Sequence, residues 1–370
     1  MRDFIKIEGQ YNEAKVFNPD IDDSSYQQIK LMLDREEFKD NTFRFMPDVH
    51  YGKGSTVGTT MTVKDKVVPN FIGVDIGCGV NVTELKLTKK EASDPKFLKV
   101  FDRNARQNVP LGFKRHQKWH ESPLLEREDF LISKKLEEDT FYQSIGTLGG
   151  GNHFISLEAT DDGKVYLLIH SGSRNIGHTV ATHYQSVADS LNPFKRKGEA
   201  YLDGEMFEEY LHDLALAQKY ALQNRIAMSE AILKSNGLDK RDRFDSVHNY
   251  IEMDTMIARK GAISAREGEK MVIPFNARDG SVIARGKGNE DWNQSAPHGA
   301  GRVMSRTQAR KRIPLPEYQR MMQNVYSTSV SKQTLDEAPS AYNPQNKILK
   351  LAAPTIEVME YLRPIYNLKA

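Results

Sequence analysis

The sequence has 370 residues, of which 39% are hydrophobic and 28% charged, a composition that indicates a globular protein with a substantial buried core. Its 52 Lys and Arg residues nearly balance its 50 Asp and Glu residues, so the net charge of +2 does not indicate a nucleic-acid partner, and any basic surface must be local. Cys78 is the only cysteine, which excludes an internal disulfide.

The first residues, Met1 to Phe17, lack the unbroken apolar stretch of a signal peptide, and no segment approaches the ~20 apolar residues of a membrane span. We therefore expect a cytoplasmic protein with no membrane partner. The sequence contains no internal repeat, low-complexity tract or linker rich in Pro, Gly and Ser. One large domain covering residues 1–370 is expected.

Three segments carry clear secondary-structure patterns. The apolar runs Phe71 to Val74 and Val165 to Ile169 end in polar or glycine-rich turns, so each predicts a buried strand that delivers side chains to a site. From Glu205 to Ser235 apolar residues recur every three or four positions, and Gly237 follows as a stop. This pattern predicts a long amphipathic helix within a helical excursion over residues 195–240. Because helices and strands do not alternate regularly, we expect an α+β architecture, a single large mixed α/β domain.

Two glycine-rich segments near the N-terminus contain residues that could carry chemistry. Residues 46–55 place Asp48, His50 and Lys53 among glycines, which allow the backbone to approach a ligand closely, although a surface turn would have the same composition. Residues 73–80 place Asp75 and Cys78 three apart between glycines. A carboxylate and a thiolate at this spacing can both reach one metal centre, and a thiolate can bridge two. A buried cysteine beside a turn aspartate would look the same.

Three histidines in polar turns strengthen the metal hypothesis. His153 follows Asn152 and a glycine run, His170 follows the second predicted strand, and His248 precedes an asparagine. With Asp75 and Cys78 they form a set of nitrogen, oxygen and sulfur ligands large enough for two divalent ions. His50, His178 and His183 are left as weaker candidates, since an isolated histidine is usually solvated or structural.

Residues 295–306 combine an imidazole with guanidinium groups. His298 precedes a Gly-Ala-Gly turn, after which Arg302, Arg306 and Arg310 recur every four residues, a spacing that on a helix places three guanidiniums along one face. Guanidiniums and helix N-termini both suit phosphate. A solvated basic helix face is the alternative, but here His298 lies where it could attack a phosphate.

Together these segments resemble the RtcB family of RNA ligases. The matching motifs are MPDVH, GVDIGCGV, GTLGGGNHF, HSGSRNIG, HN, RKGA, RGKGN, HGAGRVMSR and DEAPSAY, followed by a lysine one residue from the C-terminus. They occur in this order from Met46 to Lys369 and cover most of the chain.

The resemblance implies an RNA ligase that joins a 3′-phosphate or 2′,3′-cyclic phosphate end to a 5′-hydroxyl end with GTP and two Mn²⁺ ions. Asp75, Cys78, His153, His170 and His248 would hold the metals. His298 would accept GMP and Asp48 would orient it. The residues expected to contact the nucleotide are Asn152, Asn276, Arg302, Ser305, Tyr342 and Lys369. We expect a monomer, and an activating helper protein is compatible with the family.

Two departures from the family pattern leave nucleotide choice and substrate range open. Ser156 stands where the family has an acidic residue that can hydrogen-bond the guanine edge, so discrimination for guanine should fall unless Glu158 or another group substitutes. The glycine- and serine-rich stretch before RGKGN is replaced by Pro274 to Ser281. Two alternatives follow: an enzyme that caps or repairs RNA or DNA phosphate ends without efficient sealing, and a metal-stabilised RNA-binding protein without catalysis.

Overall fold

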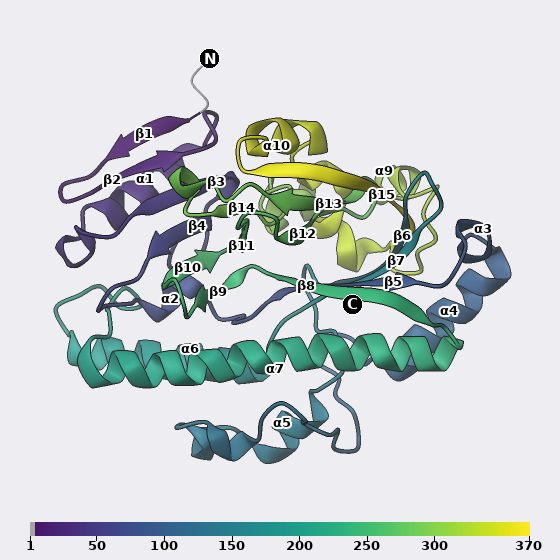
Figure 1. Cartoon of the computed structure of the whole chain (residues 1–370), viewed down its shortest axis with the longest axis horizontal. Coiled ribbons are helices and arrows are strands. Elements are labelled where there is room, and N and C mark those ends of the chain that lie inside the picture. Colours follow the sequence, from purple (N-terminus) through teal and green to yellow (C-terminus); the bar gives the residue numbers. More distant parts are fainter. Residues whose placement is uncertain (1–3) are drawn as a thin grey trace.

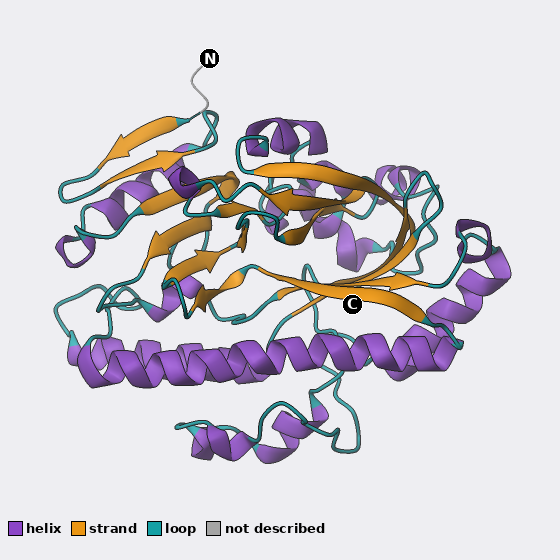
Figure 2. Ribbon diagram, viewed as in Figure 1, coloured by secondary structure: helices purple, strands orange, loops and turns teal. Residues whose placement is uncertain are grey.

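The computed structural model describes residues 4–370 and confirms the mixed α+β architecture. Two large sheets lie above a pair of long helices, and a short helical excursion lies on the other side of that pair (Figure 1). Strands gather in the upper part of the molecule and the longest helices lie beneath them (Figure 2). Along the chain the strands and helices do not alternate regularly.

The first sheet has six strands in the order β1-β2-β3-β4-β10-β9, antiparallel except for the parallel pair β2 and β3. Its strands are β1 (Ile5–Glu8), β2 (Glu13–Val16), β3 (Phe43–His50), β4 (Val57–Thr62), β9 (Asn249–Glu252) and β10 (Ile257–Lys260). The last residues of β3 contain the MPDVH motif, so this sheet delivers Asp48 and His50 to one edge.

The second sheet has seven strands, all antiparallel, in the order β12-β13-β15-β6-β7-β5-β8. Its strands are β5 (Gly79–Leu85), β6 (Phe154–Ala159), β7 (Val165–Ser171), β8 (Lys240–Val247), β12 (Lys270–Asn276), β13 (Gly280–Gly286) and β15 (Ile356–Leu368). The register pairs His170 with Val80 and with Phe154, and Gly79 with Val247. The starts of β5 and β6 and the ends of β7 and β8 therefore meet at one edge.

A short two-stranded sheet contacts strands of both large sheets. In it β11 (Ala262–Ser264) pairs with β14 (Ser295–Pro297), and Ala262 lies opposite Pro297. This pairing places His298 directly beside Gly261, where a Cβ atom would lie 3.2 Å from the imidazole Cε1 of His298. Gly261 has φ +62°, so the position favours glycine both sterically and conformationally.

The long helix predicted from sequence is confirmed as α7 (Gly204–Asn236), which ends at Gly237 with φ +61°. It contacts α4, α6, β5, β7 and β9. The α-helices are α1 (Asp23–Leu33), α2 (Pro69–Ile72), α3 (Lys89–Ala92), α4 (Pro95–Asn108), α5 (Glu138–Gln143), α6 (Arg174–Leu191), α7, α8 (Arg306–Arg312), α9 (Leu315–Met321) and α10 (Gln345–Ala352). Short 3₁₀ segments cover Glu36–Phe38, Arg127–Asp129, Ser133–Lys135, Glu290–Trp292, Lys332–Glu337 and Pro339–Ala341.

One of the two predicted strands is confirmed and the other is wrong. Residues 165–169 lie within β7, which is buried throughout. Residues 71–74, in contrast, form the end of α2 and the turn after it. Pro69 at the first helical position fixes a φ angle suited to a helix, and an apolar run of four residues fits a buried helical turn as well as a strand.

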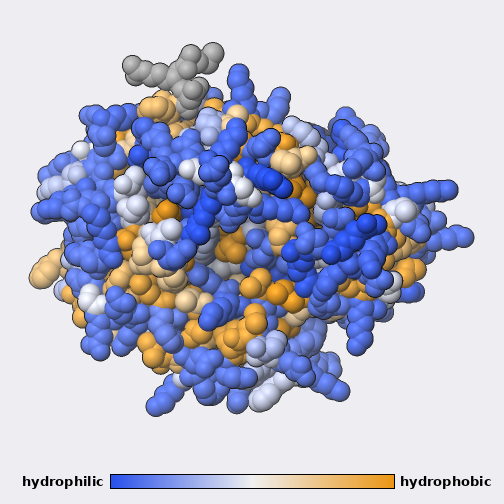
Figure 3. Space-filling model, viewed as in Figure 1, coloured by the Kyte–Doolittle hydropathy of each residue, from blue (hydrophilic) through white to orange (hydrophobic). Residues whose placement is uncertain are grey.

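The surface agrees with the balanced composition. Hydrophilic side chains dominate the face shown in Figure 3, with hydrophobic ones gathered in smaller patches between them. Within residues 4–370, the helices are all too short or too polar to cross a bilayer.

Candidate functional site

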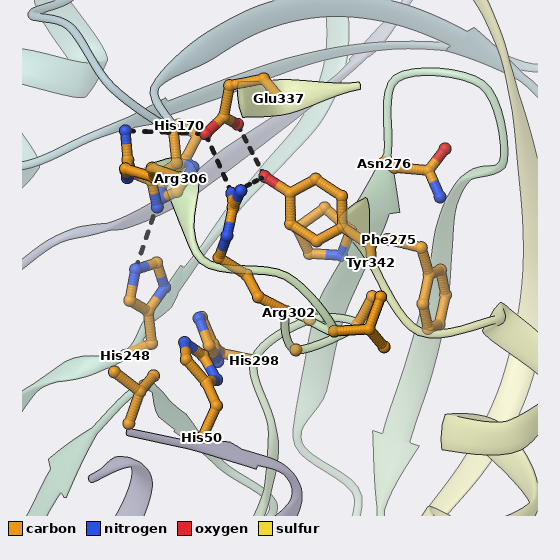
Figure 4. A pocket seen from close by; sticks show the side chains of 18 of the residues that line it. His50, His170, His248, Phe275, Asn276, His298, Arg302, Arg306, Glu337 and Tyr342 are labelled. Atoms are coloured by element: carbon orange, nitrogen blue, oxygen red, sulfur yellow. Dashed lines mark hydrogen bonds and ion pairs between the residues drawn. The ribbon is translucent and has the colours of Figure 1, made fainter. Parts of the chain in front are cut away.

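A cavity of about 880 Å³ lies where the edges of the two large sheets face each other. Its wall contains His50 from β3, His170 from β7 and His298 after β14 (Figure 4). Cys78, just before β5, and Lys369, after β15, also line it. Residues separated by most of the chain length therefore share one wall.

Five predicted metal ligands meet at one end of this cavity. The Cys78 Sγ lies 3.3 Å from the Nε2 of His170 and 3.5 Å from the Nε2 of His153. The Nε2 of His170 lies 3.3 Å from the Nε2 of His248, and the Nε2 of His153 lies 2.9 Å from the Asp75 Oδ2. These atoms form two overlapping groups, Cys78 with His170 and His248, and Cys78 with Asp75 and His153.

The donor spacing fits metal ions. Ligand atoms about 2.0–2.3 Å from a tetrahedral ion lie roughly 3.3–3.7 Å from one another. The contacts of the Cys78 Sγ with His170 and His153 fall in this range, and so does the contact between His170 and His248. Because Cys78 belongs to both groups, its sulfur can bridge two ions.

The protonation of two histidines in the cluster also suits metal binding. Burial and neighbouring positive groups hold the pKa values of His170 and His248 well below the usual range, so both imidazoles are neutral donors. Burial raises the pKa of the Cys78 thiol, and the neighbouring Asp75 carboxylate adds to this effect. Burial alone would raise the pKa of Asp75, but His153, Cys78 and Arg174 together lower it below its ordinary value. A cation bound among the thiol, the carboxylate and the three imidazoles would interact favourably with all of these closely spaced groups.

Buried polar contacts hold the ligands in place. The Nδ1 of His153 lies 2.8 Å from the carbonyl oxygen of Leu148, which leaves Nε2 to face the cluster. The Arg225 guanidinium on α7 is fully buried and donates to the carbonyl oxygens of Gly77 and Ser171, each one residue from a ligand. It is paired with Asp245 at 2.6 Å. The long helix therefore fixes the two segments that carry Cys78 and His170.

His298 lies next to the metal-ligand cluster with its ring oriented by a carboxylate. Its Nδ1 is 2.7 Å from the Asp48 Oδ2, and its ring centroid is 4.9 Å from that of His248. With the proton of Nδ1 donated to Asp48, Nε2 keeps a free lone pair. His50 lies beside it (Figure 4), and its Nδ1 is bonded to the Asp48 carbonyl oxygen at 2.9 Å.

The arginines after His298 converge on two acidic residues that sequence reasoning did not assign. Arg302 pairs with Glu337, and Arg306 and Arg310 pair with Asp336, each at 3.3 Å or less. The prediction that all three arginines lie on one helix is wrong for Arg302, because α8 begins only at Arg306, after the Ser305 N-cap. Both acidic residues lie in the DEAPSAY motif, but a motif does not reveal which cations its carboxylates meet.

The remaining predicted nucleotide contacts also line the cavity. Lys369 donates to Glu337 at 2.8 Å and its Nζ lies 3.5 Å from the carbonyl oxygen of Asn152. Tyr342 donates its hydroxyl hydrogen to Glu337, and Arg302 lies over the Tyr342 ring. The residues that fall in this wall are Asn152, Asn276, Arg302, Ser305, Tyr342 and Lys369. The structure places His178 and His183 on α6, outside both metal-ligand groups.

Lys260, at the end of β10, is a further cavity residue that sequence reasoning left without a role. It is buried, and its ammonium group donates to the carbonyl oxygens of Lys53, Ser55 and Asn70. Burial lowers the pKa of Lys260 to about 7. Three backbone carbonyls in place of a carboxylate indicate that this lysine holds the glycine-rich loop after β3 against α2.

Comparison with known proteins identifies the family of the chain. The family model described as tRNA-splicing ligase RtcB matches residues 38–139 and 125–370. The chain belongs to the RtcB family. It is 32% identical over 365 residues to the RNA-splicing ligase RtcB of Escherichia coli strain K12, covering 88% of this chain and 89% of the relative. It is 26% identical over 400 residues to the tRNA-splicing ligase RtcB of Pyrobaculum aerophilum, covering 83% of each. With the RtcB of Archaeoglobus fulgidus the identity is 27% over 414 residues, covering 86% of each.

Proposed function

We propose that this RtcB family member is an RNA ligase that joins RNA 3′-phosphate or 2′,3′-cyclic phosphate ends to 5′-hydroxyl ends, with GTP as the activating nucleotide. Family membership supports the RNA ligase function. The GTP dependence and the chemistry of the ends rest on the arrangement around His298.

The observation that carries the proposal is the position of His298. Its Nδ1 is held by Asp48 at 2.7 Å, while its ring lies beside that of His248, a candidate metal ligand, and faces a cavity walled by Arg302 and Lys369. An oriented neutral imidazole beside cations and a metal cluster is suited to attack phosphorus. A purely structural histidine would not require a buried carboxylate on one nitrogen and an open cavity on the other.

In the proposed first step the Nε2 of His298 attacks the α-phosphorus of GTP. A P–N bond forms, the bond from the α-phosphorus to the bridging oxygen breaks, and pyrophosphate leaves with the bonding electron pair. Asp48 stabilises the positive charge that develops on the ring. An oxygen of the RNA 3′-phosphate then attacks the histidine-bound phosphorus and displaces the imidazole. Finally the 5′-hydroxyl oxygen attacks the 3′-phosphorus, GMP leaves, and the hydroxyl proton is released.

Two divalent ions, proposed to be Mn²⁺, would be held by the five residues of the cluster, Asp75, Cys78, His153, His170 and His248. Bound there, they would offset charge on the phosphates and assist opening of a cyclic phosphate by water. The basic residues Arg302 and Lys369 are already neutralised in part by Glu337. We infer that Glu337 reduces the positive charge of this wall, so that the wall attracts phosphates without binding them too tightly for release.

Covalent labelling tests the proposal. N-terminally tagged protein is incubated with Mn²⁺ and each of four α-³²P-labelled NTPs, then resolved on a denaturing gel. We expect an acid-labile label from GTP in the wild type and in His183→Ala, which changes a histidine outside the cluster, and none in His298→Ala. Label that persists in His298→Ala would exclude this histidine as the nucleophile.

The replaced segment Pro274 to Ser281 supports one alternative within enzymes. This hairpin between β12 and β13 contributes Pro274, Asn276 and Ser281 to the cavity wall. A changed wall could favour capping of phosphate ends over sealing. With labelled RNA carrying a 3′-phosphate, accumulation of the capped end without a joined product would favour this alternative.

A further inference from the structure

The part of the cavity between β6 and β13 contains polar atoms that the fold leaves without partners. Glu158 is 3% exposed and Ser281 is fully buried, and both line the cavity. Within residues 4–370, the Glu158 Oε2 and the Ser281 Oγ have no hydrogen-bond partner. A buried polar atom without a partner destabilises the folded protein. Buried polar atoms of this kind are usually satisfied by a ligand or a solvent molecule, which supplies the missing hydrogen bond.

Glu158 reaches the cavity because Ser156 supports it. The two residues are two apart on β6, so their side chains point to the same face. The Ser156 hydroxyl donates to the Glu158 Oε1 at 2.9 Å. Ser156 itself is fully buried. Among the residues that the structure describes, Glu158 lines the cavity and Ser156 does not. The carboxylate therefore presents its second oxygen, Oε2, to a ligand.

The same face of β6 connects this carboxylate to the metal-ligand cluster. Phe154 packs against His170 with ring centroids 5.4 Å apart, and it also lines the cavity. Glu158 follows four residues later, about 13 Å along an extended strand. A ligand with phosphates near the cluster and a base further along β6 would bring the base to Glu158.

The chemistry at this end favours a ligand with N–H donors. Burial raises the pKa of Glu158 to about 7, and the Ser156 hydroxyl together with the polar groups of nearby Ser281 offsets this only in part. An ionised carboxylate accepts hydrogen bonds at several positions and donates none. Guanine presents two adjacent donors, its N1–H and its 2-amino group. Adenine presents one donor beside an acceptor nitrogen, which would face the carboxylate unfavourably.

We propose that Glu158, held by Ser156 and assisted by Ser281, is the residue that selects the base of the activating nucleotide, and that it favours guanine. This inference rests on the proposed function, because it requires that a nucleotide occupies the cavity. It assigns the selection of guanine to a carboxylate two positions beyond Ser156. The hydroxyl at 156 then acts as a positioning group and does not contact the base.

The test compares GTP and ATP in Mn²⁺, by direct binding in a His298→Ala background and by covalent labelling with His298 intact. We expect Glu158→Gln to weaken GTP binding by about tenfold to a hundredfold. It should also lower the GTP-to-ATP ratio, because an amide can pair with the donor and the acceptor of adenine. Ser156→Ala should give a smaller loss in the same direction. Glu357→Gln, at an exposed position on β15, is the matched control and should leave both values unchanged.

The outcomes separate this inference from the proposed function. Unchanged discrimination in a folded, metal-loaded Glu158→Gln protein would overturn the role of Glu158 and leave the ligase proposal intact. If Glu158→Gln does not fold, Glu158→Asp withdraws the carboxylate by one methylene and must still lose discrimination. Absence of binding and label from every nucleotide in the wild type would overturn the proposed function and this inference with it.

Discussion

Asp48 and His298 lie 250 residues apart in the sequence and are joined by a 2.7 Å contact between the Asp48 Oδ2 and the imidazole Nδ1. The same oxygen accepts hydrogen bonds from the backbone N–H groups of His298 at 3.1 Å and Gly299 at 3.2 Å. Gly301 lies against the Asp48 backbone, where a Cβ atom would lie 2.6 Å from the carbonyl oxygen. One fully buried carboxylate thus fixes both the ring and the loop that carries it.

Asp48→Asn tests the orienting role of this carboxylate. The asparagine amide can donate to the imidazole Nδ1, which would place the ring proton on Nε2 and block the attacking lone pair. We expect the single-turnover rate of guanylylation to fall by about 10²- to 10⁴-fold while metal content stays unchanged. Asp254→Asn, which changes an exposed aspartate, is the control. A rate within twofold of the wild type would show that the pair only stabilises the loop.

Cys78→Ser tests the shared position of the thiol between the two ligand groups. A serine hydroxyl stays protonated near neutral pH and is a poor ligand for a divalent ion, so both groups lose a donor. We expect Mn²⁺ affinity to fall by at least about tenfold, measured as metal retained per chain after dialysis by mass spectrometry. His183→Ala should retain the wild-type metal content. Full metal retention in Cys78→Ser would exclude a bridging sulfur.

Glu158 gives the ligand-free protein a defined pH dependence. Its pKa is raised from an ordinary value of 4.5 to about 7 in the folded protein. Between these two pH values the folded chain holds a proton that the unfolded chain has released, so the free energy of unfolding falls as the pH rises. The loss is complete above pH 7 and amounts to roughly 3 kcal/mol.

Glu158→Gln removes this titration and should therefore become more stable relative to the wild type as the pH rises. We expect the difference in the free energy of unfolding, from urea titrations at pH 5 and pH 8, to shift by up to roughly 3 kcal/mol in favour of the variant. Glu357→Gln, at an exposed position, should show no such shift. If the difference in the free energy of unfolding between the variant and the wild type does not vary with pH, the pKa of Glu158 is not raised in the folded protein.

The side chains that the sequence proposed as metal ligands do lie together, and the predicted long helix is confirmed, because each prediction depends on local or strongly patterned information. The glycine-bounded Asp75 and Cys78 indicated ligands by residue type alone, and Gly237 marked the end of α7. The run Phe71 to Val74 was assigned wrongly because its apolar character fits either a strand or a helical turn. Pro69 was the signal that could have decided for a helix.

Pairings between distant charged residues could not be predicted. The regular spacing of Arg302, Arg306 and Arg310 predicted a continuous helical face. In the structure Arg302 instead forms an isolated β-bridge before α8, and Asp336 and Glu337 pair with the three arginines. Spacing indicates which residues can lie on one face, but tertiary packing determines which carboxylate they meet. The resemblance to the family indicated which residues to examine. Only the fold shows which of the charged residues form ion pairs.

Lys369 and Glu337 form the most buried pair in this network, with side chains 7% and 3% exposed and a separation of 2.8 Å. Burial raises the pKa of Glu337, but Lys369, with Arg306 and Tyr342, lowers it below its ordinary value, so the pair stabilises the fold at neutral pH and loses this effect as the pH falls. Lys369→Met should lower the free energy of unfolding at pH 7 by about 3 kcal/mol. The exposed Lys350→Met is the control.

A second change separates the stabilising role of Lys369 from a role in nucleotide binding. Adding Glu337→Gln to Lys369→Met removes the uncompensated buried carboxylate, so part of the lost stability should return in thermal unfolding. Covalent labelling from GTP should stay reduced in the double variant, because a cation facing the cavity is still missing. If labelling recovers together with stability, Lys369 acts only by neutralising Glu337, and its assignment to the nucleotide is wrong.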